Sequence, residues 1–138
     1  MNSQTFPKEF YQACRHYENA VHLLTTTYPS LQDPKIFLSI VDNLYQAVNL
    51  STIALQVKSI QELAEKYPLR KETKEILIEL KEIVDSHKKS PVEFRRGTKM
   101  VICKTNYRLI VLTTSLLETY LQRIKEFLEY TDTILKGK

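Results

Sequence analysis

The sequence is poor in the residues that make tight turns, disulfide frameworks and membrane spans. Its 138 residues include two glycines, two cysteines and no tryptophan. So few glycines disfavour a sandwich or barrel of many short strands. No apolar run approaches the roughly 20 residues that a membrane-spanning helix needs, and the first residues show no secretory signal. We therefore expect a cytoplasmic protein with no membrane association.

Signatures of catalysis and of cofactor binding are also missing. The chain has no G-x-S-x-G elbow, no P-loop, no G-x-G-x-x-G and no H-E-x-x-H. Cys14 and Cys103 have no C-x-x-C spacing and lie in apolar patterns, where burial makes a thiol a poor nucleophile. Metal binding would need more ligands than the three scattered histidines supply. We expect no metal, no cofactor and no catalytic site built on these residues.

What the chain does contain is helical periodicity, and its length fits one domain, residues 1–138. Apolar residues that recur every three or four positions predict helices over residues 8–27, 34–67, 71–88 and 115–135, the second with a break near residues 57–59. The predicted fold class is all-α, a four-helix bundle with a small β-hairpin inserted before the last helix.

Local signals place the ends of these helices. Thr5 is a start signal for the first helix, and Tyr28-Pro29 should end it, because the residue before proline avoids the α region. At the start of the second helix, Asp33 supplies a side-chain acceptor at the N-cap, and Pro34 fixes φ at the first helical position. Ser115, with Glu118 three residues later, predicts a capping box for the last.

The inserted segment, about residues 91–112, is where the helical pattern stops. The pattern predicts a hairpin of two strands, residues 92–95 and 100–103, with Gly97 in the turn between them. An alternative interpretation adds a third strand over residues 107–112. Its apolar residues indicate that the hairpin helps to close the core, which would leave only the turn, residues 95–99, free for a partner. These apolar residues are Val92, Phe94, Val101 and Ile102.

The positive charge of the protein is concentrated in this segment. Residues 88–108 contain seven cations and the single acid Glu93, a net charge of +6, so the rest of the chain sums to −2 against the overall +4. Cations on a protruding turn suit phosphate contacts, and Phe94 and Tyr107 can offer stacking faces beside them. The alternative is a solvated basic loop. The predicted nucleic-acid-binding residues are Arg95, Arg96, Lys99, Lys104 and Arg108.

The helix over residues 34–67 has a polar face that is almost uncharged. Between Lys35 and Lys58 the only charged residue is Asp42. Such a face fits a helix packed against another subunit, because burying charge is costly, and it predicts a homo-oligomer. The alternative is that the loop after the first helix, or the hairpin, covers this face.

The order of these parts resembles the HEPN superfamily. The resemblance rests on Arg15-His16 and His22 in the first helix and on residues 43–56 of the central helix, and it covers residues 8–57 and 113–136 at the level of pattern. It implies a small, typically dimeric helical bundle that acts as an RNase or as an RNA-binding partner of a nucleotidyltransferase. The chain also looks like small uncharacterised archaeal helical proteins, which implies no activity.

Active members of that superfamily carry an arginine separated from a histidine by four to six residues, and six lie between Arg15 and His22. The resemblance therefore implies these two as catalytic candidates. The family's motif lies at a later helix junction, however, whereas both residues here lie in the first helix. Two helical turns separate them by about 10 Å, so a catalytic pair would need both subunits.

Three functional hypotheses follow. The leading one is a non-enzymatic binding module that contacts RNA or DNA through the basic hairpin. The second is a protein-interaction or structural homodimer that uses the central helix. The third is an HEPN-like RNase.

Overall fold

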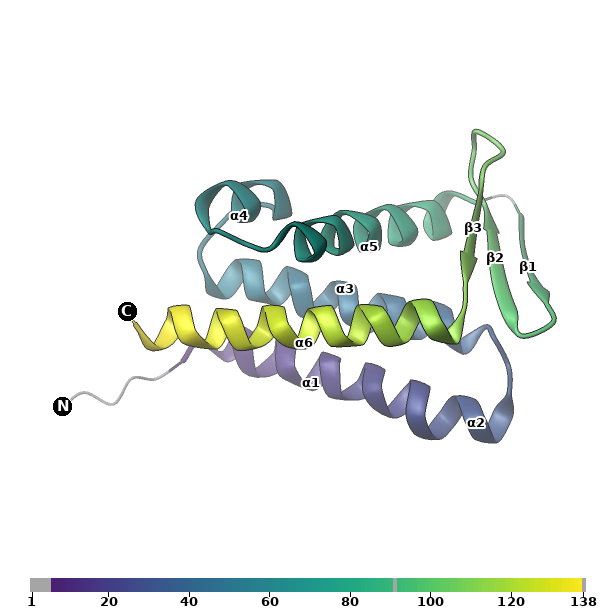
Figure 1. Ribbon diagram of the computed structural model, residues 1–138, viewed down its shortest axis with the longest axis horizontal. Coiled ribbons are helices and arrows are strands. Elements are labelled where there is room, and N and C mark those ends of the chain that lie inside the picture. Colours follow the sequence, from purple (N-terminus) through teal and green to yellow (C-terminus); the bar gives the residue numbers. More distant parts are fainter. Residues whose placement is uncertain (1–5, 91, 138) are drawn as a thin grey trace.

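A computed structural model describes residues 6–90 and 92–137 of the chain. Most of these residues are helical, and a small antiparallel sheet precedes the last helix, which confirms the predicted order of helices and strands (Figure 1). The elements are α1 (Lys8–His22), the π-helical turn η1 (Leu23–Thr27), α2 (Tyr28–Leu31), α3 (Ile36–Ala54), α4 (Ile60–Lys66), α5 (Lys71–Lys89), β1 (Val92–Arg96), β2 (Lys99–Cys103), β3 (Leu109–Leu112) and α6 (Thr114–Lys136).

The first helix does not end at Tyr28-Pro29, and that prediction is wrong. Helical backbone runs from α1 through η1 into α2, with Pro29 in the first turn of α2. In a regular α-helix the ring of Pro29 would clash with the carbonyl four residues earlier. The π-helical turn widens the helix just before this position. The chain leaves the helix at Gln32, whose φ of 52° is left-handed. Thr5, the predicted start signal, lies outside the described residues.

The second predicted helix is divided, as its proposed break indicated. α3 ends at Ala54, Gln56 takes a left-handed φ of 61°, and α4 starts after Ser59, whose hydroxyl accepts the N–H of Glu62 at 3.1 Å. The start differs by two residues from the expected one. Asp33 accepts the N–H of Lys35 at 3.0 Å, and α3 begins at Ile36.

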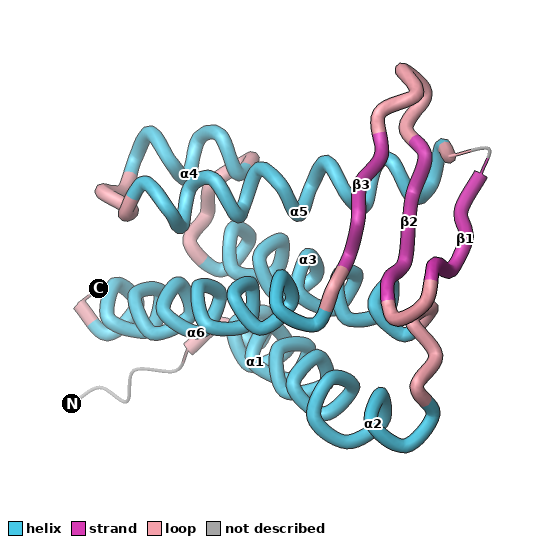
Figure 2. Tube along the Cα trace, turned by 45° about the vertical axis from the view of Figure 1, so that its right-hand side comes forward, coloured by secondary structure: helices cyan, strands magenta, loops and turns pink. Residues whose placement is uncertain are grey.

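The core forms around α3, which contacts α1, α5 and α6 (Figures 1 and 2). The four long helices α1, α3, α5 and α6 run side by side, and the short α2 and α4 add to this arrangement. In the described part of the chain, no helix is both long enough and apolar enough to cross a membrane. The fully buried side chains of α3 include Phe37, Ile40, Leu44, Ala47 and Val48.

The strands form one sheet in the order β1-β2-β3, which lies across one end of the helices (Figure 2). The inserted segment is therefore three-stranded, as the alternative interpretation had it. Gly97 and Thr98 form the two-residue loop between β1 and β2. Gly97 has a φ of 62°, which glycine adopts without strain at the first central position of a type II′ turn.

The last helix is capped by a different residue from the one predicted. The hydroxyl of Thr113, not that of Ser115, accepts the N–H of Leu116 at 3.1 Å. Thr113 has extended backbone angles, whereas Ser115 already lies inside α6 with its side chain exposed. The predicted capping box of Ser115 and Glu118 is therefore wrong. The N-cap lies two residues earlier, at Thr113, because α6 begins immediately after β3.

This difference yields a stability prediction. Thr113→Ala should lower the free energy of unfolding by about 1 kcal/mol, because it removes the acceptor for the N–H of Leu116. The matched control is Ser115→Ala, which should change stability by no more than about 0.5 kcal/mol at an exposed helix position. Urea denaturation followed by circular dichroism measures both values. Equal losses in the two variants would contradict the assignment of the cap.

Candidate nucleic-acid interface

The sheet has two faces of different character, which follow from its register. Glu93 lies opposite Ile102, and Ile102 lies opposite Ile110, so these three share the inner face that meets the helices. Phe94, Val101 and Val111 are likewise aligned across the strands on the outer face. The whole inner set is Glu93, Arg95, Met100, Ile102, Ile110 and Leu112, and the outer set is Val92, Phe94, Arg96, Lys99, Val101, Cys103, Leu109 and Val111.

The expectation that four apolar hairpin residues close the core is right for one of them. Ile102 belongs to the core cluster, whereas Val92 and Phe94 are 50% and 41% exposed on the outer face. Val101 is buried, but between its own outer-face neighbours Phe94 and Val111, not in the core cluster. The free surface consequently includes the exposed residues of the outer face and not only the turn.

The predicted basic residues fall into two groups. Arg95 and Lys104 form ion pairs inside the molecule, with Asp33 at 3.5 Å and with Glu82 at 3.2 Å. In the described part of the chain, none of the other three predicted cations takes part in an ion pair, and their side chains are exposed. These three are Arg96, Lys99 and Arg108. Arg96 and Lys99 are register partners at the end of the hairpin.

Both predicted stacking residues are accessible next to these cations. Phe94 precedes Arg96 by two positions on the outer face. Tyr107, directly before Arg108, is 87% exposed and has a left-handed φ of 67°. Its loop is held by the N–H of Tyr107, which donates to the carbonyl of Lys104 at 2.9 Å, and by the N–H of Arg108, which donates to the Asn106 side chain at 3.0 Å. An aromatic side chain therefore stands beside free cations at each end of the sheet.

The one acid in the basic segment is turned away from this face. Glu93 lies on the inner face, and its carboxylate contacts Nδ1 of His87 at the end of α5. The carboxylate of Glu93 is therefore held on the side opposite Arg96 and Lys99. The outer face carries cations and apolar groups without a carboxylate of its own.

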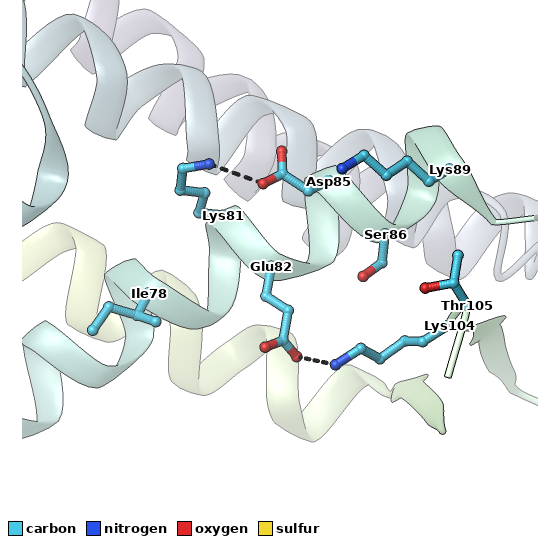
Figure 3. A pocket seen from close by; sticks show the side chains of 8 residues that line it. All are labelled: Ile78, Lys81, Glu82, Asp85, Ser86, Lys89, Lys104 and Thr105. Atoms are coloured by element: carbon cyan, nitrogen blue, oxygen red, sulfur yellow. Dashed lines mark hydrogen bonds and ion pairs between the residues drawn. The ribbon is translucent and has the colours of Figure 1, made fainter. Parts of the chain in front are cut away.

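A hollow lies beside the sheet, between α5 and the loop after β2 (Figure 3). Its cavity of about 380 Å³ is crossed by ion pairs from Lys81 to Asp85, at 2.9 Å, and from Lys104 to Glu82. The hydrogen bond from Lys81 lowers the pKa of Asp85. Since two of its three lysines are already paired with acids, this hollow offers little net charge to an anion.

The two catalytic candidates are exposed on α1, and the structure does not bring them into one pocket. Arg15 lines a polar hollow of about 500 Å³ between α1 and α3, together with His16 and Gln46. His16 shares a 2.9 Å hydrogen bond with Asn43 of α3. His22 does not line this hollow. Pairing Arg15 with His22 in catalysis stays a prediction that needs a second subunit.

Neither cysteine is fully buried, contrary to expectation. Cys14 and Cys103 are both half-buried and free. Burial, followed by the charges of Glu18 and Asp132, raises the pKa of the Cys14 thiol, which disfavours the thiolate that a nucleophile requires. Within residues 6–90 and 92–137, no group of three or more histidine, cysteine or carboxylate side chains is arranged to hold a metal ion.

The uncharged face of α3 is only partly available to a partner. Asn43 is bonded to His16 and to the carbonyl of Ser39, so the packing of α1 uses part of this face. Asp42, Asn49 and Ile53 remain exposed. The covered part of this face lies against α1, and self-association through α3 stays a prediction.

No protein-family model, no curated protein and no solved structure matches this chain. The resemblance to the HEPN superfamily accordingly stays a prediction from the sequence pattern.

Proposed function

We propose that this protein is a non-enzymatic binding module that contacts single-stranded RNA or DNA through the outer face of its sheet. The observation that carries the proposal is the placement of the free cations beside exposed aromatic rings. Arg96 and Lys99 lie with Phe94 at one end of the sheet, and Arg108 follows Tyr107 at the other.

Each part of this surface suits one part of a nucleotide. Guanidinium and ammonium groups neutralise phosphates and release counterions. Exposed aromatic faces stack on unpaired bases without reading their sequence. Phe94, Arg96 and Lys99 share the outer face, and Tyr107 and Arg108 stand in the loop at the other end of the sheet, so that a strand of nucleic acid can run from one end to the other. The proposal therefore predicts binding with little sequence preference and strong salt dependence.

The ion pairs within the molecule indicate which cations contribute most to phosphate binding. Arg95 and Lys104 already form ion pairs with Asp33 and Glu82, so they should contribute less to phosphate binding than the three cations without an ion pair. The sequence alone does not distinguish Arg95 from Arg96 and Lys99 in the turn. The narrower proposal places Arg96 and Lys99 at the centre of the interface.

The test is binding of fluorescent, mixed-sequence single-stranded RNA and DNA oligonucleotides, followed by anisotropy. Arg96→Glu/Lys99→Glu should weaken binding by about tenfold or more, which corresponds to about 1.4 kcal/mol. The slope of log affinity against log salt should fall by about 1.4, at about 0.7 for each of the two lost phosphate contacts.

Two controls isolate the interface. Lys8→Glu/Lys125→Glu makes the same change of net charge at exposed helix positions away from the sheet and should leave most of the affinity. Arg95→Gln/Lys104→Gln should have the smaller effect expected of cations that are already paired. Unaltered binding in Arg96→Glu/Lys99→Glu would overturn the proposal, as would failure of the unmodified protein to bind either oligonucleotide.

The apolar side chains of the outer face favour a second candidate, a protein partner. Val92, Leu109 and Val111 are exposed and aliphatic, and such groups are typical of protein interfaces more than of base stacking. A protein without affinity for either oligonucleotide would favour this candidate. Location in the cytoplasm and the HEPN-like RNase activity stay predictions from the sequence.

A further inference from the structure

The strand β3 is an unprotected edge of the sheet. In the described part of the chain, β1 and β3 each pair only with β2, so both are edge strands. Edge strands usually carry charges that discourage pairing with another chain. β1 follows this rule with Glu93, Arg95 and Arg96, whereas β3 consists of Leu109, Ile110, Val111 and Leu112 and has no charge.

The backbone of β3 also has groups directed outward. The N–H of Lys104 donates to the carbonyl of Arg108 at 2.8 Å, so these two residues form a hydrogen-bonded pair of the β2–β3 ladder. Such pairs alternate along an antiparallel ladder. Ile110 and Leu112 therefore direct their backbone groups toward β2, and Leu109 and Val111 direct theirs away from it. The open edge offers two N–H and two carbonyl groups.

We propose that a second copy of this chain pairs with this edge, β3 antiparallel to β3, about a two-fold axis. In the pairing that uses all four outward groups, Leu109 lies opposite Val111 of the partner subunit, and Ile110 lies opposite Ile110 of the partner subunit. The two sheets become one sheet of six strands. β3 is drawn on the near side of the molecule in Figure 1, with no other element in front of it.

A second copy fits this edge better than another arrangement of the same two chains. Packing outer face on outer face would set Arg96 and Lys99 of each copy against a face that carries no carboxylate to pair with them. Edge pairing sets the uncharged β3 against itself, so no like charges stand directly opposite. A pairing shifted by one residue in each copy would place Leu109 against Thr113 of the partner subunit. The carbonyl and hydroxyl of Thr113 are already bonded within α6.

This pairing adds to the proposed nucleic-acid interface without resting on it. The two outer faces lie on the same side of the six-stranded sheet, because the two-fold axis is perpendicular to it. The strands of the two copies run in opposite directions, so their hairpin turns point to opposite ends of the combined face.

Sedimentation velocity over a concentration series tests the pairing. Leu109→Lys/Val111→Lys places a lysine opposite a lysine twice and should weaken dimerisation about tenfold or more. Leu109→Lys/Val111→Glu places each lysine opposite a glutamate of the partner subunit and should retain the dimer. Both variants change only exposed outer-face side chains, and their thermal melts confirm that each is folded.

A dimer that survives in Leu109→Lys/Val111→Glu but not in Leu109→Lys/Val111→Lys supports both the edge and its register. Equal dimer dissociation constants for the two variants would overturn the proposal, and a dimer in both would have to form through another surface, such as α3. A strict monomer at every concentration of the unmodified protein would also overturn it. A monomer that still binds the oligonucleotides would leave the nucleic-acid proposal standing.

Discussion

Replacing Ile102 by alanine is expected to lower the free energy of unfolding by about 2–5 kcal/mol. Ile102 is the fully buried residue in the middle of the inner sheet face, and it joins the sheet to the helical core. Truncation loses the transfer free energy of its side chain and leaves a cavity that the neighbouring strands close only in part. Chemical denaturation followed by circular dichroism measures the loss. If the alanine variant is too unstable to study, Ile102→Val replaces it, with an expected loss in the free energy of unfolding of about 0.5–1.5 kcal/mol.

The matched control for this prediction is Val92→Ala. Val92 is also an apolar residue of the inserted segment, but it lies on the outer face and is half-exposed, so its truncation should cost about 0.5 kcal/mol or less. Equal losses in Ile102→Ala and Val92→Ala would mean that both faces of the sheet are buried. That result would contradict the interface proposed for the outer face.

Alkaline conditions are expected to destabilise the protein through Tyr120. Burial, together with the hydrogen bond from its hydroxyl to Glu79 at 2.7 Å, raises the pKa of this phenol well above its ordinary value of 10.0. The folded state then keeps a proton that the unfolded chain releases. The stabilisation is complete below pH 10 and falls as the pH rises further, by about 1.4 kcal/mol for each pH unit.

Comparison with Tyr120→Phe separates this effect from the titration of the lysines, which both proteins share. Near neutral pH the variant should be less stable by about 1 kcal/mol, because it lacks the hydrogen bond to Glu79. Above pH 10 the difference should shrink and then reverse, since phenylalanine has no proton to retain. Free energies of unfolding at several pH values measure the difference, and parallel curves for the two proteins would refute this role for Tyr120.

The helices were the most predictable part of the fold, because their apolar periodicity and end signals are local. α5 agrees with its predicted range to within one residue, and the break after α3 was anticipated from the same pattern. The failures occurred at helix ends, because a single residue does not fix where a helix starts or stops. Pro29 normally marks a helix end, yet the preceding π-helical turn lets the helix continue through it.

The candidate site was predicted in composition but not in arrangement. The sequence identified Arg96, Lys99 and the aromatic Phe94, and it treated Arg95 as their equal. Alternation along β1 indicates that Arg95 and Arg96 point to opposite faces, but both faces of this strand contain residues able to meet a partner. Which face packs on the helices depends on contacts with the helical part of the chain. Arg95 pairs with Asp33, which is distant in sequence, and Glu93 contacts His87 at the end of α5. The position of β3 at an edge also depends on tertiary structure, because it follows from the order in which the three strands pair.

A mostly helical chain with its positive charge concentrated in one β-forming insertion follows from the amino-acid sequence. Composition and short-range periodicity suffice for that, since they depend on neighbouring residues. The folded arrangement sets which cations of the insertion are free of ion pairs, which of its apolar residues face solvent and which of its strands form the edges of the sheet. Those properties depend on pairings between residues far apart in the chain, from Asp33 with Arg95 to Glu82 with Lys104. No local pattern specifies such pairs.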